Sequence, residues 1–235
     1  MHNSHIPADV IERVTRARGK RHLFDGIAPG RAALVVVDMQ NFFLEEGQAC
    51  ETPEARDIVA NVNRLAHAAR SEGANVVWLQ MTQDRDQLQG WSVFYDFVKA
   101  GERGLEELDC LSAGHHGHRL WPGLDVGADD LKVEKRRFSA FIEGSSDLHA
   151  ILRERGIDTV MITGTLTNVC CLTTALDAMM LNYKVLMVSD ANAALSDDTH
   201  NAALGTFCEL FGDVRTTDEV VALLEEGGAE SAAAE

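Results

Sequence analysis

Long apolar runs are missing from this chain of 235 residues, and none approaches the roughly 20 residues of a membrane-spanning helix. Prolines number only four, while 46% of residues are apolar, which indicates a compact globular protein. Basic residues are also scarce, since 21 lysines and arginines stand against 37 acidic residues and give a net charge of −16. That charge repels phosphates, so neither nucleic acid nor an anionic membrane is an expected partner.

Paired cysteine motifs are missing too. The five cysteines are odd in number and contain no C-x-x-C pair; they are Cys50, Cys110, Cys170, Cys171 and Cys208. We therefore expect no disulfide framework and a reducing, cytoplasmic location. The first twenty residues are polar rather than a basic cap on an apolar core, so we do not expect a secretory signal there. No glycine-rich phosphate loop is present.

What the chain does have is an alternation of short β-branched runs and longer amphipathic ones. Apolar residues are continuous in 33–37 and 75–80, and residues 57–72 between them repeat apolar positions at helical spacing. The alternation continues through further runs at 131–133, 159–162, 184–188 and 213–216. Continuous apolar strands separated by helices predict a three-layer α/β/α domain with a mainly parallel sheet of about six strands.

The two ends of the chain differ from its middle. Residues 1–30 are predicted to form a helix at 8–18 and an extended arm, of the kind that often reaches a neighbouring subunit. Residues 227–235 contain only Gly, Ala, Ser and Glu, and are predicted to be a disordered acidic tail. The domain itself is expected at 31–226, with loops and short helices of 82–129 lying over its site.

Three reactive side chains follow three of the predicted strands: Asp38, Lys135 and Cys170. In an open parallel sheet such groups gather beyond the carboxyl ends of the strands. Together they could perform nucleophilic catalysis, in which Asp38 accepts the thiol proton, Lys135 stabilises both anions and the thiolate attacks a carbonyl. Each residue alone has an ordinary interpretation as a turn former, a solvated lysine or a core cysteine.

The nucleophile's position is suggested by residues 164–178, where a strand leads through a Gly/Thr/Asn turn into a helix. Cys170 then lies near a helix N-terminus, where free N–H groups and the helix dipole favour a thiolate and can hold an oxyanion.

Three segments carry a resemblance to a known family: 33–43, 135–141 and 164–178. In order and separation they resemble the motifs of the isochorismatase-like cysteine hydrolases, and the resemblance covers about residues 31 to 224. It implies a Rossmann-like fold, an isochorismatase-like hydrolase domain at 31–226, and a catalytic triad of Asp38, Lys135 and Cys170. It also implies a homodimer or homotetramer.

The resemblance extends to the backbone beside the nucleophile. It implies a non-proline cis peptide at Thr165–Leu166 and an oxyanion hole made by the N–H groups of Leu166 and Cys170. The family's nucleophile sits three residues after the threonine that matches Thr167, which selects Cys170 over Cys171. Cys171 is one residue further along a helix, about 100° away, and is expected to face the packing.

A metal or other cofactor is not expected. Nicotinamidases of this family carry an Asp-x-His pattern after the second strand, whereas residues 80–86 contain no histidine. The histidines at His115, His116 and His118 lie in a glycine-rich segment without cysteines or carboxylates, and are interpreted as a surface loop of unassigned role.

The presence of Cys170 favours hydrolysis of a C–N bond in a small, planar amide or ureido (carbamoyl) compound, through a thioacyl intermediate that releases ammonia or an amine. Two alternatives remain: an isochorismatase-type vinyl-ether hydrolase, in which Cys170 is dispensable, and a non-catalytic binding member of the family. Arg85, Arg136 and Arg137 are possible clamps for an anionic substrate. Other candidate substrate-binding residues, whose aromatic members could equally be core, are Gln40, Phe42, Phe43, Trp91, Phe94, Phe138 and Asn168.

Overall fold

The sheet of this protein has six strands that all run parallel, in the order β3-β2-β1-β4-β5-β6. A computed structural model describes residues 1–233. The central strands β1 (Ala32–Val37) and β4 (Thr159–Thr165) are buried along their whole length, as the continuous apolar runs predict. The other strands are β2 (Asn75–Met81), β3 (Leu131–Lys135), β5 (Lys184–Ala193) and β6 (Asp213–Arg215).

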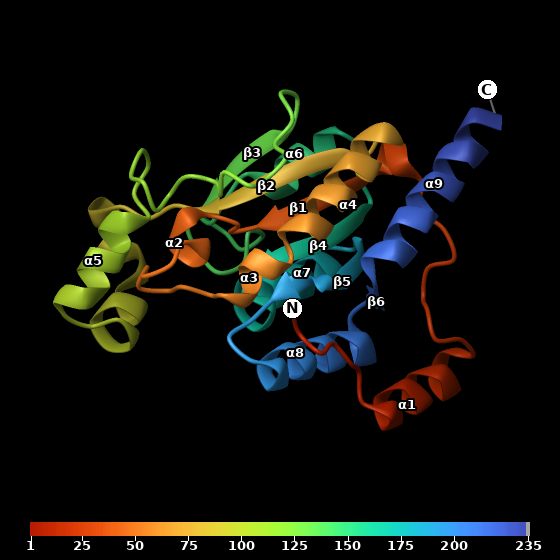
Figure 1. Ribbon diagram of the computed structural model, residues 1–235, viewed down its shortest axis with the longest axis horizontal. Coiled ribbons are helices and arrows are strands. Elements are labelled where there is room, and N and C mark those ends of the chain that lie inside the picture. Colours follow the sequence, from red (N-terminus) through yellow and green to blue (C-terminus); the bar gives the residue numbers. More distant parts are fainter. Residues whose placement is uncertain (234–235) are drawn as a thin grey trace.

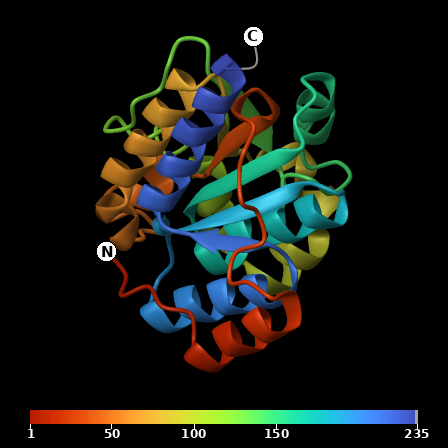
Figure 2. The ribbon, with the colours of Figure 1, turned by 90° about the vertical axis from the view of Figure 1, so that its right-hand side faces the viewer.

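Helices cover both faces of this sheet, and the predicted three-layer α/β/α architecture is confirmed (Figures 1 and 2). On one face α4 (Val59–Ser71) and α9 (Thr217–Ala233) pack together against side chains such as Leu34 and Trp78. The other face is covered by α1 (Ala8–Arg18), α6 (Leu148–Glu154), α7 (Leu172–Met180) and α8 (Asp197–Leu210). Within the described chain no helix is long and apolar enough to cross a bilayer.

The segment between β2 and β3 extends beyond the carboxyl end of the sheet, at the far left of Figure 1. It holds the short helical turns η2 (Arg85–Trp91) and η3 (Phe94–Val98) and helix α5 (Glu102–Cys110), in agreement with the expected loops and short helices. The remaining short elements are η1 (Pro29–Arg31), α2 (Asn41–Leu44), α3 (Glu54–Asp57) and η4 (Thr167–Cys171).

The two chain ends compare differently with their predictions. The helix predicted at 8–18 is present as α1, and the arm before it lies on its own chain, where Ser4 and His5 contact residues of α8. At the other end α9 continues to Ala233 instead of giving way to disorder at Gly227, and residues 234–235 of the predicted tail lie outside the described residues. Gly227 is buried against the backbone of Ile27, where an added Cβ would lie 1.9 Å from the carbonyl oxygen. This packing, with the high helix propensity of the alanines that follow, explains the continuation.

Candidate active site

An ion pair is buried completely at the carboxyl end of the sheet. The Nζ atom of Lys135 lies 2.8 Å from Oδ2 of Asp38, and both side chains have no exposed surface. Asp38 follows β1 directly, and Lys135 is the last residue of β3, where it is in register with Met81 of β2. The lysine therefore reaches across the end of β2 to the aspartate, while its Nζ also donates to the carbonyl oxygen of Arg137 at 3.1 Å.

The backbone at this point allows two strands to approach closely. Asp38 has a φ of +52°, which is uncommon for a residue with a Cβ and marks a position where the chain turns out of its strand. On β4, Gly164 is in register with Val37, the residue before Asp38, and has a φ of +111°; an added Cβ would lie 2.1 Å from the carbonyl oxygen of Val37. Only glycine fits there, so β4 reaches the nucleophile turn directly beside the aspartate.

The turn itself carries Cys170. The peptide bond between Thr165 and Leu166 is cis, and the carbonyl oxygen of Leu166 accepts hydrogen bonds from the N–H groups of Val169 and Cys171, both at 3.1 Å. Cys170 lies in the π-type turn η4, which leads directly into α7. Its thiol is within hydrogen-bonding reach of both Asp38 and Lys135, so the structure brings all three predicted residues together.

Burial controls the protonation of this group of three. It raises the pKa of Cys170 to about 12, although the Lys135 ammonium acts in the opposite direction. The resting nucleophile is therefore a thiol, because burial outweighs the preference for a thiolate near a helix N-terminus. Burial also raises the pKa of Asp38 against the attraction of Lys135, which makes this carboxylate a stronger base. Burial alone would lower the pKa of Lys135, but attraction to Asp38 and Cys170 raises it, and the ammonium stays charged.

Cys170 opens onto a cavity of 600 Å³. Predicted substrate-binding residues that line it are Phe42, Phe43, Phe94 and Phe138, and Leu166 lies beside the thiol. Sequence reasoning missed Tyr95 and Gln83, whose hydroxyl and Oε1 are joined by a hydrogen bond of 2.8 Å within this wall. Gln83 follows β2 by two residues and is buried, and its place just beyond the carboxyl end of a strand is the sequence signal that could have found it.

The family model of the isochorismatase domain matches residues 32–219. The chain belongs to the isochorismatase family. Among curated relatives of this isochorismatase-family protein, a probable inactive nicotinamidase of Arabidopsis thaliana is 36% identical over 172 residues, which cover 72% of this chain and 84% of the relative. The ureidoacrylate amidohydrolase RutB of Pseudomonas syringae pv. syringae is 31% identical over 214 residues, covering 81% and 82%.

Among solved structures, a cysteine hydrolase from Pseudomonas syringae pv. phaseolicola superimposes with a TM-score of 0.76 at 30% identity. The superposition covers 88% of this chain and 99% of that one. Family and relatives therefore include hydrolases of C–N bonds outside peptides, and the predicted resemblance is confirmed.

Three of the substrate-binding candidates lie away from the cavity in this isochorismatase-family chain. Gln40 is fully buried and ties the strand ends together, because its Nε2 donates to the carbonyl oxygens of Met81 and His118 and its Oε1 accepts from Met81 N–H. Trp91 stacks behind Phe94 and does not line the wall. Asn168 is exposed, because the first turn of η4 rotates it toward solvent.

The histidine segment is only partly a surface loop. His115 and His116 are exposed, and Nε2 of His116 lies 2.9 Å from a carboxylate oxygen of Glu45. His118 is buried, with Nε2 2.8 Å from the hydroxyl of Thr82. Its carbonyl oxygen accepts hydrogen bonds from the side-chain amides of Gln40 and Gln80, which hold this residue against the strand ends. Among the residues that the structure describes, no group of three or more His, Cys, Asp and Glu side chains could hold a metal ion.

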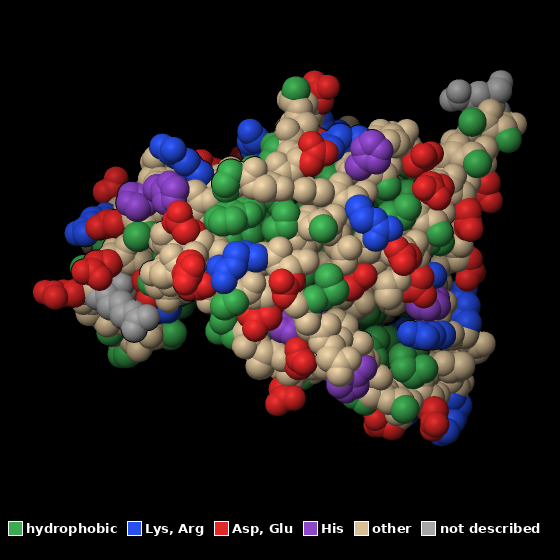
Figure 3. Space-filling model, viewed as in Figure 1, with side chains coloured by type: hydrophobic (Ala, Val, Ile, Leu, Met, Phe, Trp, Pro, Cys, Tyr) green, Lys and Arg blue, Asp and Glu red, His purple; other side chains and the backbone are tan. Residues whose placement is uncertain are grey.

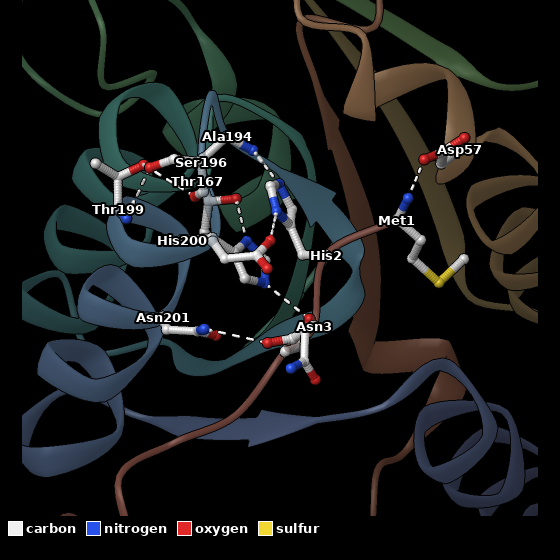
Figure 4. A network of polar contacts seen from close by, with 12 residues as sticks. Met1, His2, Asn3, Asp57, Thr167, Ala194, Ser196, Thr199, His200 and Asn201 are labelled. Atoms are coloured by element: carbon white, nitrogen blue, oxygen red, sulfur yellow. Dashed lines mark hydrogen bonds and ion pairs between the residues drawn. The ribbon is translucent and has the colours of Figure 1, made fainter.

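A second polar network reaches the nucleophile turn at Thr167 (Figure 4). Thr167, in the turn, shares a hydrogen bond of 2.9 Å with Nδ1 of His200 on α8, and Nε2 of His200 lies 3.0 Å from the hydroxyl of Ser4. The ring of His2 stacks on His200 with centroids 4.4 Å apart, while Nδ1 of His2 lies 2.6 Å from Asp197. Residues of the N-terminal arm are thus linked, through His200, to the turn that carries the nucleophile.

Proposed function

We propose that this protein is a cysteine-dependent amidohydrolase that cleaves a C–N bond in a small amide or ureido compound and releases ammonia or an amine. The observation that carries the proposal is the fully buried ion pair of Asp38 and Lys135 beside a cysteine that opens onto a cavity. A buried charge pair costs several kcal/mol of desolvation, so its presence beside a thiol favours a chemical role over a stabilising one.

The first half-reaction forms a thioester or thiocarbamate. Asp38 accepts the proton of the Cys170 thiol as Sγ attacks the carbonyl carbon, and the N–H groups of Leu166 and Cys170 hold the oxyanion. The proton then passes to the leaving nitrogen, the C–N bond breaks, and ammonia or an amine departs. Because the resting thiol has a raised pKa, proton transfer and attack are coupled and require a bound substrate.

The second half-reaction restores the enzyme. Asp38 accepts a proton from water and the hydroxide attacks the thioacyl carbon. The C–S bond then breaks to release the acid, and the proton passes from Asp38 back to Sγ of Cys170. Lys135 stays protonated throughout, so it stabilises the carboxylate and the departing thiolate in turn. For a primary amide, the sum consumes one amide and one water and produces one carboxylic acid and one ammonia. RutB, by its name an ureidoacrylate amidohydrolase, supports this reaction class for a relative with 31% identity.

The test is ammonia release from a panel of primary amides and ureido compounds, with wild type, Cys170→Ala and Cys171→Ala side by side. Cys171 is buried with its Sγ 3.9 Å from the carbonyl oxygen of Thr163, so Cys171→Ala is a matched control for loss of a thiol. We expect turnover by wild type and Cys171→Ala and none by Cys170→Ala. An acid quench during turnover should trap an acyl group on the peptide that contains Cys170.

Two results would contradict the proposal. Turnover of a vinyl ether that survives Cys170→Ala and is lost in Asp38→Ala would indicate the isochorismatase-type reaction instead. Binding of panel compounds without any product from wild type would indicate a non-catalytic member of the family.

A further inference from the structure

The cavity in front of Cys170 is larger and more apolar than a ureido compound requires. Its 600 Å³ lies within the range of about 300 to 1,000 Å³ of pockets for drug-sized ligands. Four phenylalanines line it from three separate segments: Phe42 and Phe43 of α2, Phe94 of η3, and Phe138 after β3. A compact carbamoyl group would leave most of this wall without an apolar partner.

Part of the wall is held rigid from behind. Trp91 stacks on Phe94 with ring centroids 4.3 Å apart and meets Phe138 edge-on at 5.0 Å, and Phe94 meets Phe138 edge-on at 5.4 Å. Only Phe94 and Phe138 of these three line the cavity. Such an interlocked cluster presents a preformed aromatic surface to a ligand.

The three arginines that could clamp an anionic substrate are each engaged by other groups. Arg85 contacts Asp109 at 2.9 Å, Arg136 contacts Asp84 at 2.9 Å, and Arg137 lies over the ring of Trp91 and donates to the carbonyl oxygen of Gly90. None of these arginines lines the cavity, nor does any other arginine whose side chain the structure describes.

The ionic side chains that do line the wall include Lys99 and Glu107, which form a pair at 2.7 Å. The hydrogen-bonded pair of Tyr95 and Gln83 is uncharged, since burial raises the pKa of Tyr95 to about 12. Outside the cavity, acidic side chains are spread over the molecular face of Figure 3, in keeping with the net charge of −16. This field disfavours the approach of an anion.

We infer that the site takes an uncharged primary amide whose acyl group ends in an aryl or branched alkyl group, packed against Phe94 and Phe138, in preference to a ureido acid or another anionic amide. The inference rests on the proposed function and adds the substrate class. Cys170 attacks the amide carbonyl at one end of the cavity, and the apolar group fills the phenylalanine wall.

The experiment compares kcat/KM for ammonia release from phenylacetamide, isovaleramide, acetamide and succinamate, which share the amide and differ in the rest of the acyl group. We expect phenylacetamide and isovaleramide to exceed acetamide and succinamate at least tenfold, because each buried methylene contributes roughly fourfold or more. Phe94→Ala should lower kcat/KM for phenylacetamide about tenfold more than for acetamide. Phe97→Ala is the matched control, since Phe97 lies on the same turn but is 80% exposed. In this variant kcat/KM should stay unchanged for both substrates.

The outcomes separate this inference from the function on which it rests. Cys170-dependent turnover that is faster with succinamate or acetamide would overturn the apolar substrate class and leave the amidohydrolase intact. Equal losses of kcat/KM for phenylacetamide and acetamide in Phe94→Ala would also overturn the apolar substrate class. If that variant does not fold, the comparison of the four amides with the wild-type enzyme still tests the inference. Ammonia from none of the four amides, together with none from ureido compounds, would overturn the proposed function itself.

Discussion

Acid should destabilise this protein through His200, the buried histidine behind the nucleophile turn. Burial, together with the nearby His2, lowers the pKa of His200 from 6.5 to about 4, while Asp197 acts in the opposite direction. The unfolded chain therefore binds this proton first as pH falls. The contribution to stability is complete above about pH 6.5 and is lost progressively toward pH 4. At about 1.4 kcal/mol per pKa unit, the loss approaches roughly 3 kcal/mol in the free energy of unfolding.

The assay is urea unfolding of wild type and His200→Gln at several pH values between 7.5 and 4.5. Glutamine can still bond to Thr167 but does not titrate, so the difference in unfolding free energy between the two proteins isolates the histidine. We expect that difference to change by about 3 kcal/mol in favour of the variant as pH falls. His67→Gln, at an exposed position of α4, is the control and should show no such trend. A change below about 1 kcal/mol for His200→Gln would refute the reasoning.

Three further predictions concern the site. Asp38→Ala leaves the Lys135 ammonium buried without its partner and should lower the free energy of unfolding in urea by about 3 to 5 kcal/mol. The double variant Asp38→Ala/Lys135→Met should recover most of that stability without recovering activity. Equal stability of the two variants would contradict this prediction. Because the pKa of Cys170 is raised to about 12, its alkylation by iodoacetamide, followed by peptide mass spectrometry, should accelerate about tenfold per pH unit between pH 7 and 9, and a plateau below pH 8 would disprove the raised pKa. Gly164→Ala should lower the free energy of unfolding by more than about 2 kcal/mol, because the added Cβ would clash with Val37. Gly26→Ala is the control, since nothing lies within 4 Å of its added Cβ, and its free energy of unfolding in the same assay should stay within about 1 kcal/mol of wild type.

The layered fold could be predicted from the sequence because buried parallel strands leave a periodic signal. Continuous apolar residues in β1 and β4 can be satisfied only by a sheet that is covered on both faces. The extent of α9 could not be predicted, because the composition of residues 227–233 is equally compatible with helix and disorder until Gly227 finds its contact with Ile27.

From the sequence, a site residue could be predicted only where its position at the end of a strand determines which other residues it meets. Asp38 and Lys135 follow from their places at strand ends, since register alone brings those ends together. Gln40 occupies a similar place, yet its amide is used by the backbone of Met81, a pairing that depends on three-dimensional contacts between distant segments. The raised pKa of Cys170 could likewise not be predicted, because a helix terminus is visible in the sequence and the depth of burial is not.

The link from the N-terminal arm through His200 to the nucleophile turn has a consequence for the order of events during synthesis. Ser4 and His200 are 196 residues apart, so the arm leaves the ribosome long before its binding site on α8 exists. Contacts this distant in sequence close late, because most of the chain must be in place before they form. His2 and Ser4 therefore support the turn that carries Cys170, through His200, only near the end of folding, after the walls of the cavity have formed.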